Sequence, residues 1–265
     1  LVVLGLAFKM GAVPAHAWMP DVADGAPAPV AAFVTAAPKV GALIALARLV
    51  AVVPPDVDWR PVVAGLAAAT MTLGNLAALW QEDVRRLLGW SAVSQTGYAL
   101  MAVVALGRSD LAVSALLYFL AAYLLANLAA FGVVVELRGR ADLDGYRGLA
   151  GGHPLLAASL LVAFLSFVGI PPLAGFVGKL TVFTATVDAG YAWLAVLAVV
   201  NSVVSLAYYL RVLTPAYFEQ VDAPLPVLAQ SAATVTVACA VLVVVVGLGA
   251  GPVLDWFEPA RLLPG

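Results

Sequence analysis

Residues 154–187 read PLLAASLLVAFLSFVGIPPLAGFVGKLTVFTATV, an apolar stretch of 34 residues that contains two adjacent prolines and a single lysine, Lys179. As one straight helix this stretch would be about 51 Å long, whereas the hydrocarbon core of a bilayer is about 30 Å thick. A helix of this length must either tilt strongly or break. The prolines lie near the middle of the stretch and therefore predict a break.

The two prolines, Pro171 and Pro172, lack the backbone N–H that a helix requires. They leave the carbonyl groups of Phe167 and Val168 without their helical partners. Unpaired backbone groups at membrane depth are tolerated only where they face protein or a water-filled cavity. We therefore expect the break to lie inside the protein, with Lys179 one or two turns beyond it.

The rest of the chain has the composition of a membrane protein. Of its 265 residues, 64% are hydrophobic and 11% are charged, against about 25% charged in soluble domains. This composition excludes a soluble fold, and the net charge of −2 gives no reason to expect a nucleic-acid partner. The chain is predicted to be an all-α, polytopic transmembrane protein of about eight spans, two of them broken. The predicted spans are 1–18, 28–53, 61–81, 87–107, 110–137, 154–187, 190–212 and 226–249.

Arginines in the connections indicate how the spans are oriented. Counted on alternating sides, one side carries six of them: Arg85, Arg86, Arg138, Arg140, Arg147 and Arg211. The other side carries Arg60, Arg108 and Arg261, together with Arg48 near a helix end. The positive-inside rule assigns the first side to the cytoplasm and places the C-terminus on the non-cytoplasmic side.

The lysines, unlike the arginines, lie inside the apolar stretches; they are Lys9, Lys39 and Lys179. A charged side chain near the bilayer centre costs roughly 2.5 to 3.5 kcal/mol on insertion scales, so its presence there usually reflects a function. Desolvation allows a lysine to release its proton, whereas a guanidinium stays charged. Helix breaks are also expected near the other two lysines, since Pro14 frees the carbonyl of Met10 beside Lys9, and Pro38 directly precedes Lys39. Broken helices beside ionisable groups are typical of ion sites in transporters, so we predict a proton-handling site at these lysines.

Polar side chains also recur at helical spacing. One set is Ser91, Ser94, Gln95 and Tyr98; a second is Asn201, Ser205 and Tyr208; and Asn75 and Asn127 lie in neighbouring spans. Such stripes can hold a file of water molecules, which makes Gln95, Asn201 and Tyr208 candidates for a proton path. The same residue types also hydrogen-bond across helix interfaces without conducting anything. Both interpretations remain open at this point.

Other candidate residues carry weaker signals. His16 follows Pro14 and either relays protons at an entrance or caps the broken helix, while His153 lies in a Gly-Gly-His-Pro turn with a structural role. Glu136 ends a predicted span and forms a surface ion pair or lines a channel entry. Cys239, the single cysteine, excludes an internal disulfide and is expected to pack in a helix. The sequence contains no metal-ligand cluster, and the glycine-rich run 246–252 is a helix end.

Five motifs carry a resemblance to a known family. They are FKMGAVPAHAWMPDV at 8–22, GAPAPV at 25–30, GIPPLAGF at 169–176 followed by Gly178-Lys179, NSVVS at 201–205, and YYLR at 208–211. Together with Lys39 they resemble the antiporter-like membrane subunits of respiratory complex I, most closely subunit N of bacterial NADH:quinone oxidoreductase. The related L and M subunits tend to have histidine where this chain has Lys39.

The resemblance implies an antiporter-like fold that contains two inverted five-helix repeats. This chain would be the C-terminal part of such a protein and a single membrane domain. Residues 1–53 would end the first repeat, 61–212 would form the second, and 226–249 would be the closing helix. The N-terminal helices would be missing, and with them the family's essential glutamate, the acidic partner of Lys9.

The resemblance also implies a function, that of a proton-translocating subunit of a bacterial inner-membrane translocase that couples electron transfer from NADH to quinone to proton pumping. Lys39 and Lys179 would pass protons along the membrane, and Lys9 would respond to its acidic partner. The chain would hold no cofactor, because NADH and quinone bind other subunits. Its partners would be the lipid bilayer and the other antiporter-like and small membrane subunits of complex I. Two alternatives remain: a subunit of a multi-subunit cation/proton antiporter, and a non-conducting scaffold subunit.

Overall fold

The computed structural model describes residues 2–54, 56–219, 232–258, 260 and 262. Leu1 of the first predicted span, residues 226–231 of the predicted closing helix, and Arg261 lie outside the described residues. The described part of the chain is helical and has no strand, only an isolated β-bridge between Asp83 and Asp142. The all-α prediction is confirmed.

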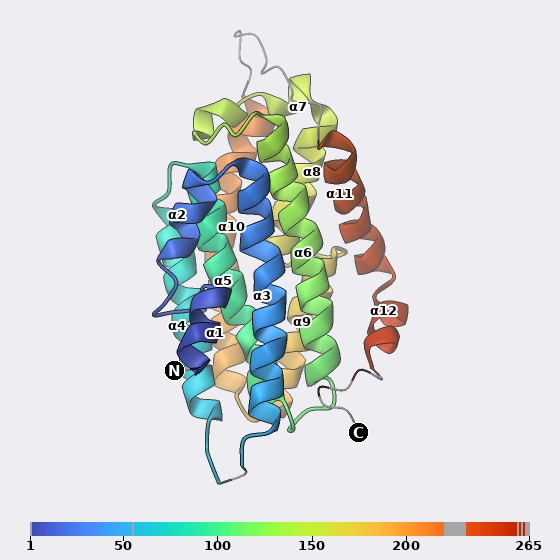
Figure 1. Cartoon of the computed structure of the whole chain (residues 1–265). Helices are drawn as coiled ribbons and strands as arrows, with labels where there is room; N and C mark the ends of the chain where they lie inside the picture. The colour runs from blue at the N-terminus through green and yellow to red at the C-terminus, as the bar shows by residue number, and fades with distance from the viewer. Residues whose placement is uncertain (1, 55, 220–231, 259, 261, 263–265) are drawn as a thin grey trace.

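The helices run side by side in one bundle, with α1 and α2 on one flank and α11 and α12 on the other (Figure 1). Their bounds are α1 Val2–Met10, α2 Trp18–Gly25, α3 Ala28–Ala51, α4 Arg60–Leu79, α5 Val84–Ala105, α6 Ala112–Glu136, η1 Leu143–Tyr146, α7 Leu149–Gly152, α8 Pro154–Val168, α9 Ala174–Asp188, α10 Ala192–Phe218, α11 Ala233–Leu248 and α12 Ala250–Phe257. Five of them, α3, α4, α5, α6 and α10, are each long and apolar enough to cross a membrane.

The remaining predicted spans are discontinuous. The first is interrupted after α1 and resumes as α2, which extends past the predicted end of the span at residue 18, and the stretch 154–187 is divided into α8 and α9. Both predicted breaks are confirmed. A third interruption was not predicted: α11 ends as expected near the glycine-rich run, but the chain then bends by 85° into α12. Conversely, α3 runs unbroken through Pro38, so the predicted break beside Lys39 is wrong.

Helix α5 lies in the interior of the bundle, because nearly all of its residues are buried. Two glycines allow α4 to approach α5 closely. Gly97 of α5 lies against the backbone nitrogen of Met71, and Gly74 of α4 lies against the backbone of Ser94, so neither position has room for a Cβ. The polar stripe predicted on α5 is therefore enclosed by protein on every side.

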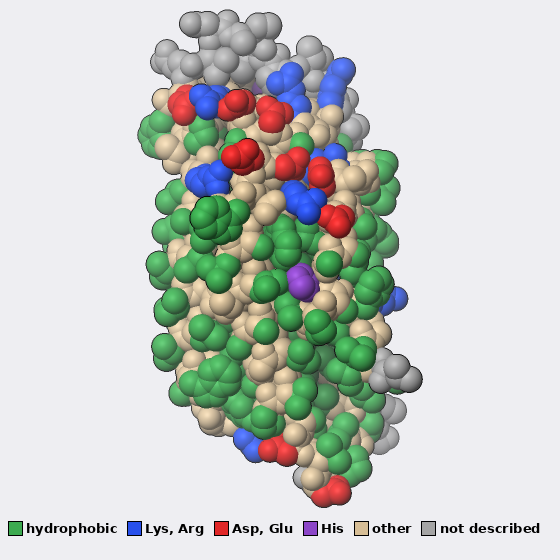
Figure 2. Space-filling view, turned by 90° about the vertical axis from the view of Figure 1, so that its left-hand side faces the viewer, with side chains coloured by type: hydrophobic (Ala, Val, Ile, Leu, Met, Phe, Trp, Pro, Cys, Tyr) green, Lys and Arg blue, Asp and Glu red, His purple; other side chains and the backbone are tan. Residues whose placement is uncertain are grey.

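Charged side chains gather at the two ends of the molecule. On the face shown in Figure 2, a broad apolar zone separates one charged end from the other. Arg211 donates to the carbonyl of Leu79 at one end, at 2.5 Å, whereas Arg60 donates to Leu106 at the opposite end, at 2.7 Å. These contacts agree with the predicted division of the arginines into two sets.

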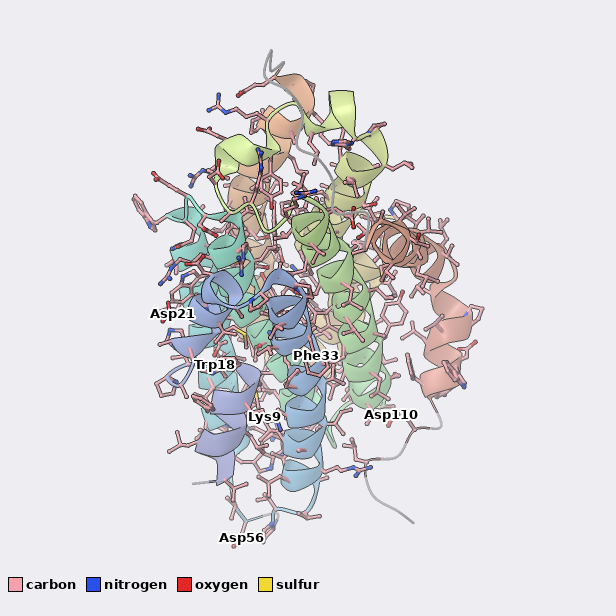
Figure 3. The ribbon with its side chains drawn as sticks, turned by 45° about the horizontal axis from the view of Figure 1, so that its top comes forward. Lys9, Trp18, Asp21, Phe33, Asp56 and Asp110 are labelled. Atoms are coloured by element: carbon pink, nitrogen blue, oxygen red, sulfur yellow. The ribbon has the colours of Figure 1, made fainter. Side chains whose placement is uncertain are left out.

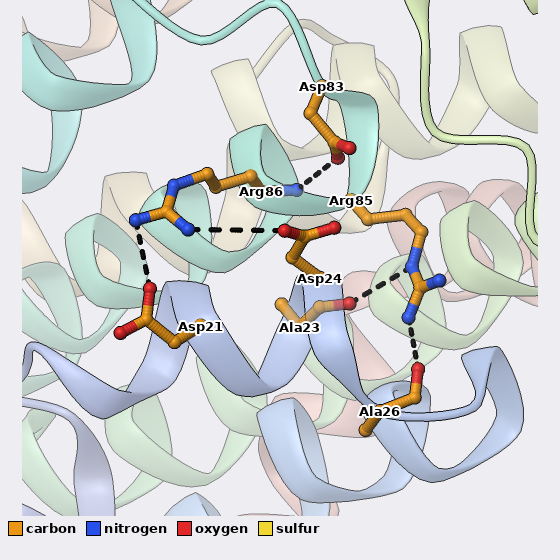
Figure 4. A network of polar contacts seen from close by, with 7 residues as sticks. All are labelled: Asp21, Ala23, Asp24, Ala26, Asp83, Arg85 and Arg86. Carbon is orange, nitrogen blue, oxygen red and sulfur yellow. Dashed lines mark hydrogen bonds and ion pairs between the residues drawn. The ribbon is translucent and has the colours of Figure 1, made fainter.

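At the first of these ends, Arg85 fastens the broken first span to α5 (Figure 4). Its Nε donates to the carbonyl of Ala23 at 3.1 Å, and its Nη2 donates to the carbonyl of Ala26. These carbonyls belong to the C-terminal end of α2, where a cation also interacts favourably with the helix dipole.

The neighbouring Arg86 extends this contact with ion pairs to Asp21 at 2.9 Å and Asp24 at 4.0 Å. Asp83 begins α5 by accepting a hydrogen bond from the backbone N–H of Arg86 at 2.8 Å. The ion pairs are solvent-exposed and contribute little to stability. The carbonyl contacts of Arg85 are therefore the stronger part of the attachment.

Replacement of Gly97 by alanine should weaken the α4–α5 pair. The new Cβ would overlap backbone atoms of Met71 and Ala67, which cannot move aside independently of α4. We expect the free energy of unfolding in detergent, measured by thermal or denaturant unfolding, to fall by about 1–3 kcal/mol. Gly65→Ala on α4 is the matched control, because a Cβ there meets open space. An equal change in the free energy of unfolding of the two variants would contradict the close approach of α4 to α5.

Candidate functional site

Lys39 lies in the middle of α3 and is 1% exposed. Its Nζ donates to the carbonyl of Ala92 on α5 and to the hydroxyl of Tyr123 on α6, the latter at 3.4 Å. The ammonium also lies 4.9 Å from the centroid of the Tyr123 ring. None of the ion pairs among the described residues includes Lys39. Its charge is therefore met by neutral oxygens and a ring face rather than by a carboxylate.

Side chains of α6 satisfy the turn of α3 that precedes Lys39. The hydroxyl of Tyr123 donates to the carbonyl of Thr35 at 2.9 Å, and Nδ2 of Asn127 donates to the carbonyl of Ala32 at 3.2 Å. These bonds fasten α3 to α6 on both sides of Val34, whose carbonyl Pro38 leaves without its helical partner. The helix continues through Pro38 while it is held against its neighbour in this way.

Lys179 lies on α9, beyond the second break, and is 4% exposed. Its Nζ donates to the carbonyl of Val168 at 3.1 Å and to Oγ of Ser202 on α10 at 3.0 Å. It also lies 4.0 Å from the centroid of the Tyr98 ring on α5. Like Lys39, it is surrounded by neutral oxygens and an aromatic ring.

The carbonyls that the two prolines free are both paired, as their position inside the protein requires. Nζ of Lys179 donates to the carbonyl of Val168, and Nε2 of Gln95 donates to the carbonyl of Phe167 at 3.1 Å. On the far side of the break, Oγ of Ser166 accepts the backbone N–H of Gly175 at 3.1 Å. The prediction that the break faces protein is confirmed.

The first break is closed in the same way. Oγ1 of Thr96 on α5 donates to the carbonyl of Met10, the group that Pro14 frees, at 2.8 Å. Nε1 of Trp18 donates to the carbonyl of Phe8 at 2.8 Å. In both breaks, side chains supply the donors that the interrupted backbone lacks.

A polar cluster continues from Lys179 into the bundle. Ser202 donates to the hydroxyl of Tyr98 at 3.3 Å, and Nδ2 of Asn75 donates to the same hydroxyl at 3.4 Å. Asn75 also donates to Oδ1 of Asn201 at 3.0 Å and accepts from the hydroxyl of Tyr208 at 2.9 Å. The structure thus brings the predicted residues Asn201 and Tyr208 together with the lysine on α9.

A small cavity lies between the Lys39 cluster and the second break. It is lined by Gln95, Phe119, Ala122, Tyr123, Ser166, Phe167 and Gly175. Its volume of about 10 Å³ is close to the smallest space that holds one water molecule, about 10–15 Å³. Tyr123 borders it from the Lys39 side, while Gln95 and Ser166 border it from the side of the break. A single water there would have polar neighbours from both clusters.

A larger pocket of about 380 Å³ lies beside the second break, with Lys179 and Ser202 in its lining. The other lining residues are apolar: Val168, Gly169, Ile170, Phe176, Leu180, Phe183, Val199, Val203 and Leu206. Leu180 and Val203 are 50% and 67% exposed. The pocket is therefore open toward the outside of the bundle between α9 and α10.

Lys9 differs from the other two lysines because it is exposed. It lines a groove of about 530 Å³ between α1 and α3, whose other walls include Phe33 and Pro38 (Figure 3). The expectation that all three lysines are buried is therefore wrong for Lys9 within this chain. The groove does place Lys9 beside the turn of α3 that carries Lys39.

The weaker candidates lie apart from this site. His16 is half-buried, its ring centroid lies 5.5 Å from that of Trp90, and its backbone carbonyl accepts the N–H of Met19 at 3.0 Å. The backbone of His16, not its imidazole, thus begins the first turn of α2. His153 precedes Pro154 at the start of α8, as expected for a structural turn.

Glu136 and Cys239 are both buried. The surface interpretation of Glu136 is wrong, since its carboxylate accepts the backbone N–H of Ala232 at 2.5 Å and so holds the start of α11. Cys239 packs inside α11, as expected.

Two residues of the site, Tyr123 and Ser202, were not among the predicted ones. Each has a local sequence signal, because Tyr123 lies one helical turn before Asn127 and Ser202 follows Asn201 directly. The stripe on α5, predicted as one file, has members with different partners. Ser91 contacts the hydroxyl of Tyr209 at 2.5 Å, and Gln95 contacts the broken helix.

The chain is similar to a known family and to curated proteins within it. The family described as NADH:quinone oxidoreductase/Mrp antiporter, transmembrane, matches residues 1–205. NADH-quinone oxidoreductase subunit N of Mycobacterium sp. (strain JLS) is 51% identical over 255 residues, which are 95% of this chain and 54% of that protein. The chain thus spans about half the length of the curated relatives that it matches.

Solved structures have the same fold. Respiratory complex I from Thermus thermophilus with bound aureothin contains a chain that matches with a TM-score of 0.83 and 37% identity, covering 96% of this chain and 57% of that one. The Mrp complex from Dietzia sp. DQ12-45-1b matches with a TM-score of 0.88 and 24% identity, covering 97% and 57%. At that identity, the Mrp complex supports the fold alone.

Thr96→Val should destabilise the first break. Valine has nearly the same shape but cannot donate to the carbonyl of Met10, and a buried acceptor without a partner costs about 1–3 kcal/mol. We expect that loss in the free energy of unfolding in detergent. Thr184→Val is the control, because the Thr184 hydroxyl is exposed and bonds only the carbonyl of Leu180 in its own helix. The control should change stability by less than about 0.5 kcal/mol, and an equal loss in both variants would count against a role of Thr96 at the break.

Proposed function

Since this chain belongs to the NADH:quinone oxidoreductase/Mrp antiporter family of membrane subunits, we propose that it translocates protons as part of subunit N of an NADH:quinone oxidoreductase. The reaction between NADH and quinone would take place on other subunits, and this chain would hold no cofactor of its own. Its contribution would be a path for protons inside the membrane.

The observation that supports this function best is the surroundings of Lys39 and Lys179. Each is buried and meets neutral oxygens and one aromatic ring. A carboxylate at hydrogen-bonding distance would hold a lysine in its charged form. Without one, the cost of burying the charge favours release of the proton when a nearby acceptor becomes available. A relay needs a group that can take either form.

The proposed path runs from Lys39 to Lys179 through the small cavity. Tyr123 accepts from Lys39 through its hydroxyl and lines the cavity. If this hydroxyl turns its own hydrogen from the carbonyl of Thr35 to a water in the cavity, it can pass that hydrogen to the water as it takes the proton of the lysine. Gln95 and Ser166 would orient that water from the opposite wall. Beyond the break, Lys179 is linked through Ser202 to the hydroxyl of Tyr98. The amide of Asn75 orients this hydroxyl and cannot itself act as the titrating group.

The proposed function also assigns roles to Lys9, to the second repeat and to the two ends of the bundle. Lys9 would respond to an acidic partner in the complete protein, which would approach it in the open groove on α1 and α3. Residues 61–212 would form one inverted repeat. The end that carries Arg85, Arg86 and Arg211 would face the cytoplasm of a bacterial cell, with the C-terminus on the opposite face. Other membrane subunits of complex I would be the partners.

A cation/proton antiporter subunit is the second candidate function. The matching family includes both NADH:quinone oxidoreductase and Mrp antiporter subunits and therefore allows this function as well. The identity of 51% to a protein named as subunit N favours the first candidate more strongly, because it reflects side chains as well as backbone. The non-conducting scaffold is favoured least. Burying two lysines inside a membrane protein costs free energy, and a scaffold has no use for them.

The role of Lys179 can be tested in the intact complex. Lys179→Ala should lower both proton pumping and the coupled reduction of quinone, because the relay loses a titrating group. Lys179→Arg should not restore them, since a guanidinium does not release its proton. The measurement is proton uptake by membrane vesicles, normalised to the amount of assembled complex. Wild-type pumping by a fully assembled Ala variant would favour the scaffold.

Lys39 allows a second test with a control on the same helix. Lys39→Gln should reduce pumping more than Ser94→Ala or Asn201→Ala, because water can replace a lost hydrogen bond but not a lost titrating group. Arg48→Gln removes a cation from the exposed end of α3 and should leave pumping near the wild-type rate. Similar losses in all four variants would indicate that packing, not proton transfer, is what these positions share.

A further inference from the structure

Helix α11 packs directly over the second break. Gly247 lies so close to the backbone of the break that a Cβ at this position would overlap the carbonyl group of Pro172, the carbonyl carbon of Leu173 and the nitrogen of Ala174. These atoms belong to the segment that joins the freed carbonyls of α8 to the start of α9. A glycine at 247 is therefore what allows α11 to lie against this segment.

Tyr118 of α6 fixes α11 in this place. Its hydroxyl donates to the carbonyl of Val246 at 2.9 Å, next to Gly247 and just before the 85° bend into α12. The same tyrosine packs on α9, where a Cβ at Gly178 would lie 3.5 Å from its ring and 3.2 Å from Cα of Phe119. Tyr118 is fully buried and so touches both the closing helix and the residue that precedes Lys179.

A further contact holds the other half of α11 on the same helix. Gly132 of α6 lies against the side chain of Thr236, with no room for a Cβ between them. Glu136, one turn farther along α6, accepts the N–H of Ala232 at the start of α11. The closing helix is thus aligned along α6, and its position at Gly247 is not free to adjust.

From this packing we infer that Gly247 is a positioning residue for Lys179, an inference that rests on the proposed function. Gly247 contacts the segment between Val168, whose carbonyl accepts from Lys179, and the helix that carries the lysine. A methyl group at 247 must push this segment away from α11. The 3.1 Å contact between Nζ of Lys179 and the carbonyl of Val168 would then change, although neither residue is altered.

The test uses Gly247→Ala in the intact complex, with Gly251→Ala as the matched control, because a Cβ at Gly251 meets open space. We expect Gly247→Ala to lower the rate of proton pumping per assembled complex by about tenfold, and the coupled reduction of quinone with it, since a misplacement of about 1 Å can cost a reacting group that much or more. Gly251→Ala should pump as the wild type does. A pumping rate in Gly247→Ala equal to that of the control would overturn the inference.

A double variant separates positioning from general damage. If Gly247 acts through Lys179, then Gly247→Ala combined with Lys179→Ala should pump no worse than Lys179→Ala alone. Losses that multiply would overturn the inference and leave the function of Lys179 standing. Wild-type pumping by Lys179→Ala would instead overturn the proposed function, and this inference with it.

Should Gly247→Ala fail to assemble, Tyr118→Phe provides the same comparison, because it removes one hydrogen bond to α11 and adds no volume. The inference requires a reduced rate of proton pumping in the assembled Phe variant, and again no further loss in combination with Lys179→Ala. A wild-type pumping rate in this variant would overturn it.

Discussion

A carbonyl group that has lost its helical partner inside a membrane must find another donor, and this structure depends on how three interruptions satisfy that requirement. At the first, Thr96 pairs with the carbonyl of Met10. At the second, Gln95 pairs with that of Phe167. At the bend after α11, Tyr118 reaches the last turn of the helix. The donors come from α5 and α6, the helices most enclosed by the rest of the bundle.

The same requirement places Lys179. It is the donor for the second carbonyl of its break and pairs with Ser202 as well. Lys39 donates to the carbonyl of Ala92 on the unbroken helix α5, and Thr96, which pairs with Met10 at the first break, contacts that carbonyl too. A change at either break would therefore also change the surroundings of a buried lysine, which is the basis of the proposed effect of Gly247 on Lys179.

Much of this arrangement follows from local sequence, because a proline removes a known donor from a known carbonyl. Pro14 and Pro171 thereby reveal two breaks and the atoms left unpaired. Pro38 misled the same reasoning, because α3 continues through it while hydrogen bonds fasten α3 to α6, and local sequence does not show which helix lies beside a turn. The exposure of Lys9 depends likewise on which helices surround α1. Partners such as Tyr123 follow from tertiary packing, and periodicity identifies only the face on which they lie.

The dimensions of the cavity between the two lysine clusters bear on how protons could pass. A volume of about 10 Å³ holds one water at most, and the rings of Tyr123 and Phe167, both in its lining, have centroids 5.9 Å apart. One water cannot form a file, so the space between the two clusters does not hold a continuous chain of water. In the proposed function, proton transfer between the clusters would require α6 and α8 to separate enough for further water to enter. Because Phe167 also presents its carbonyl to Gln95, such a movement would loosen the second break and the surroundings of Lys179 in the same step.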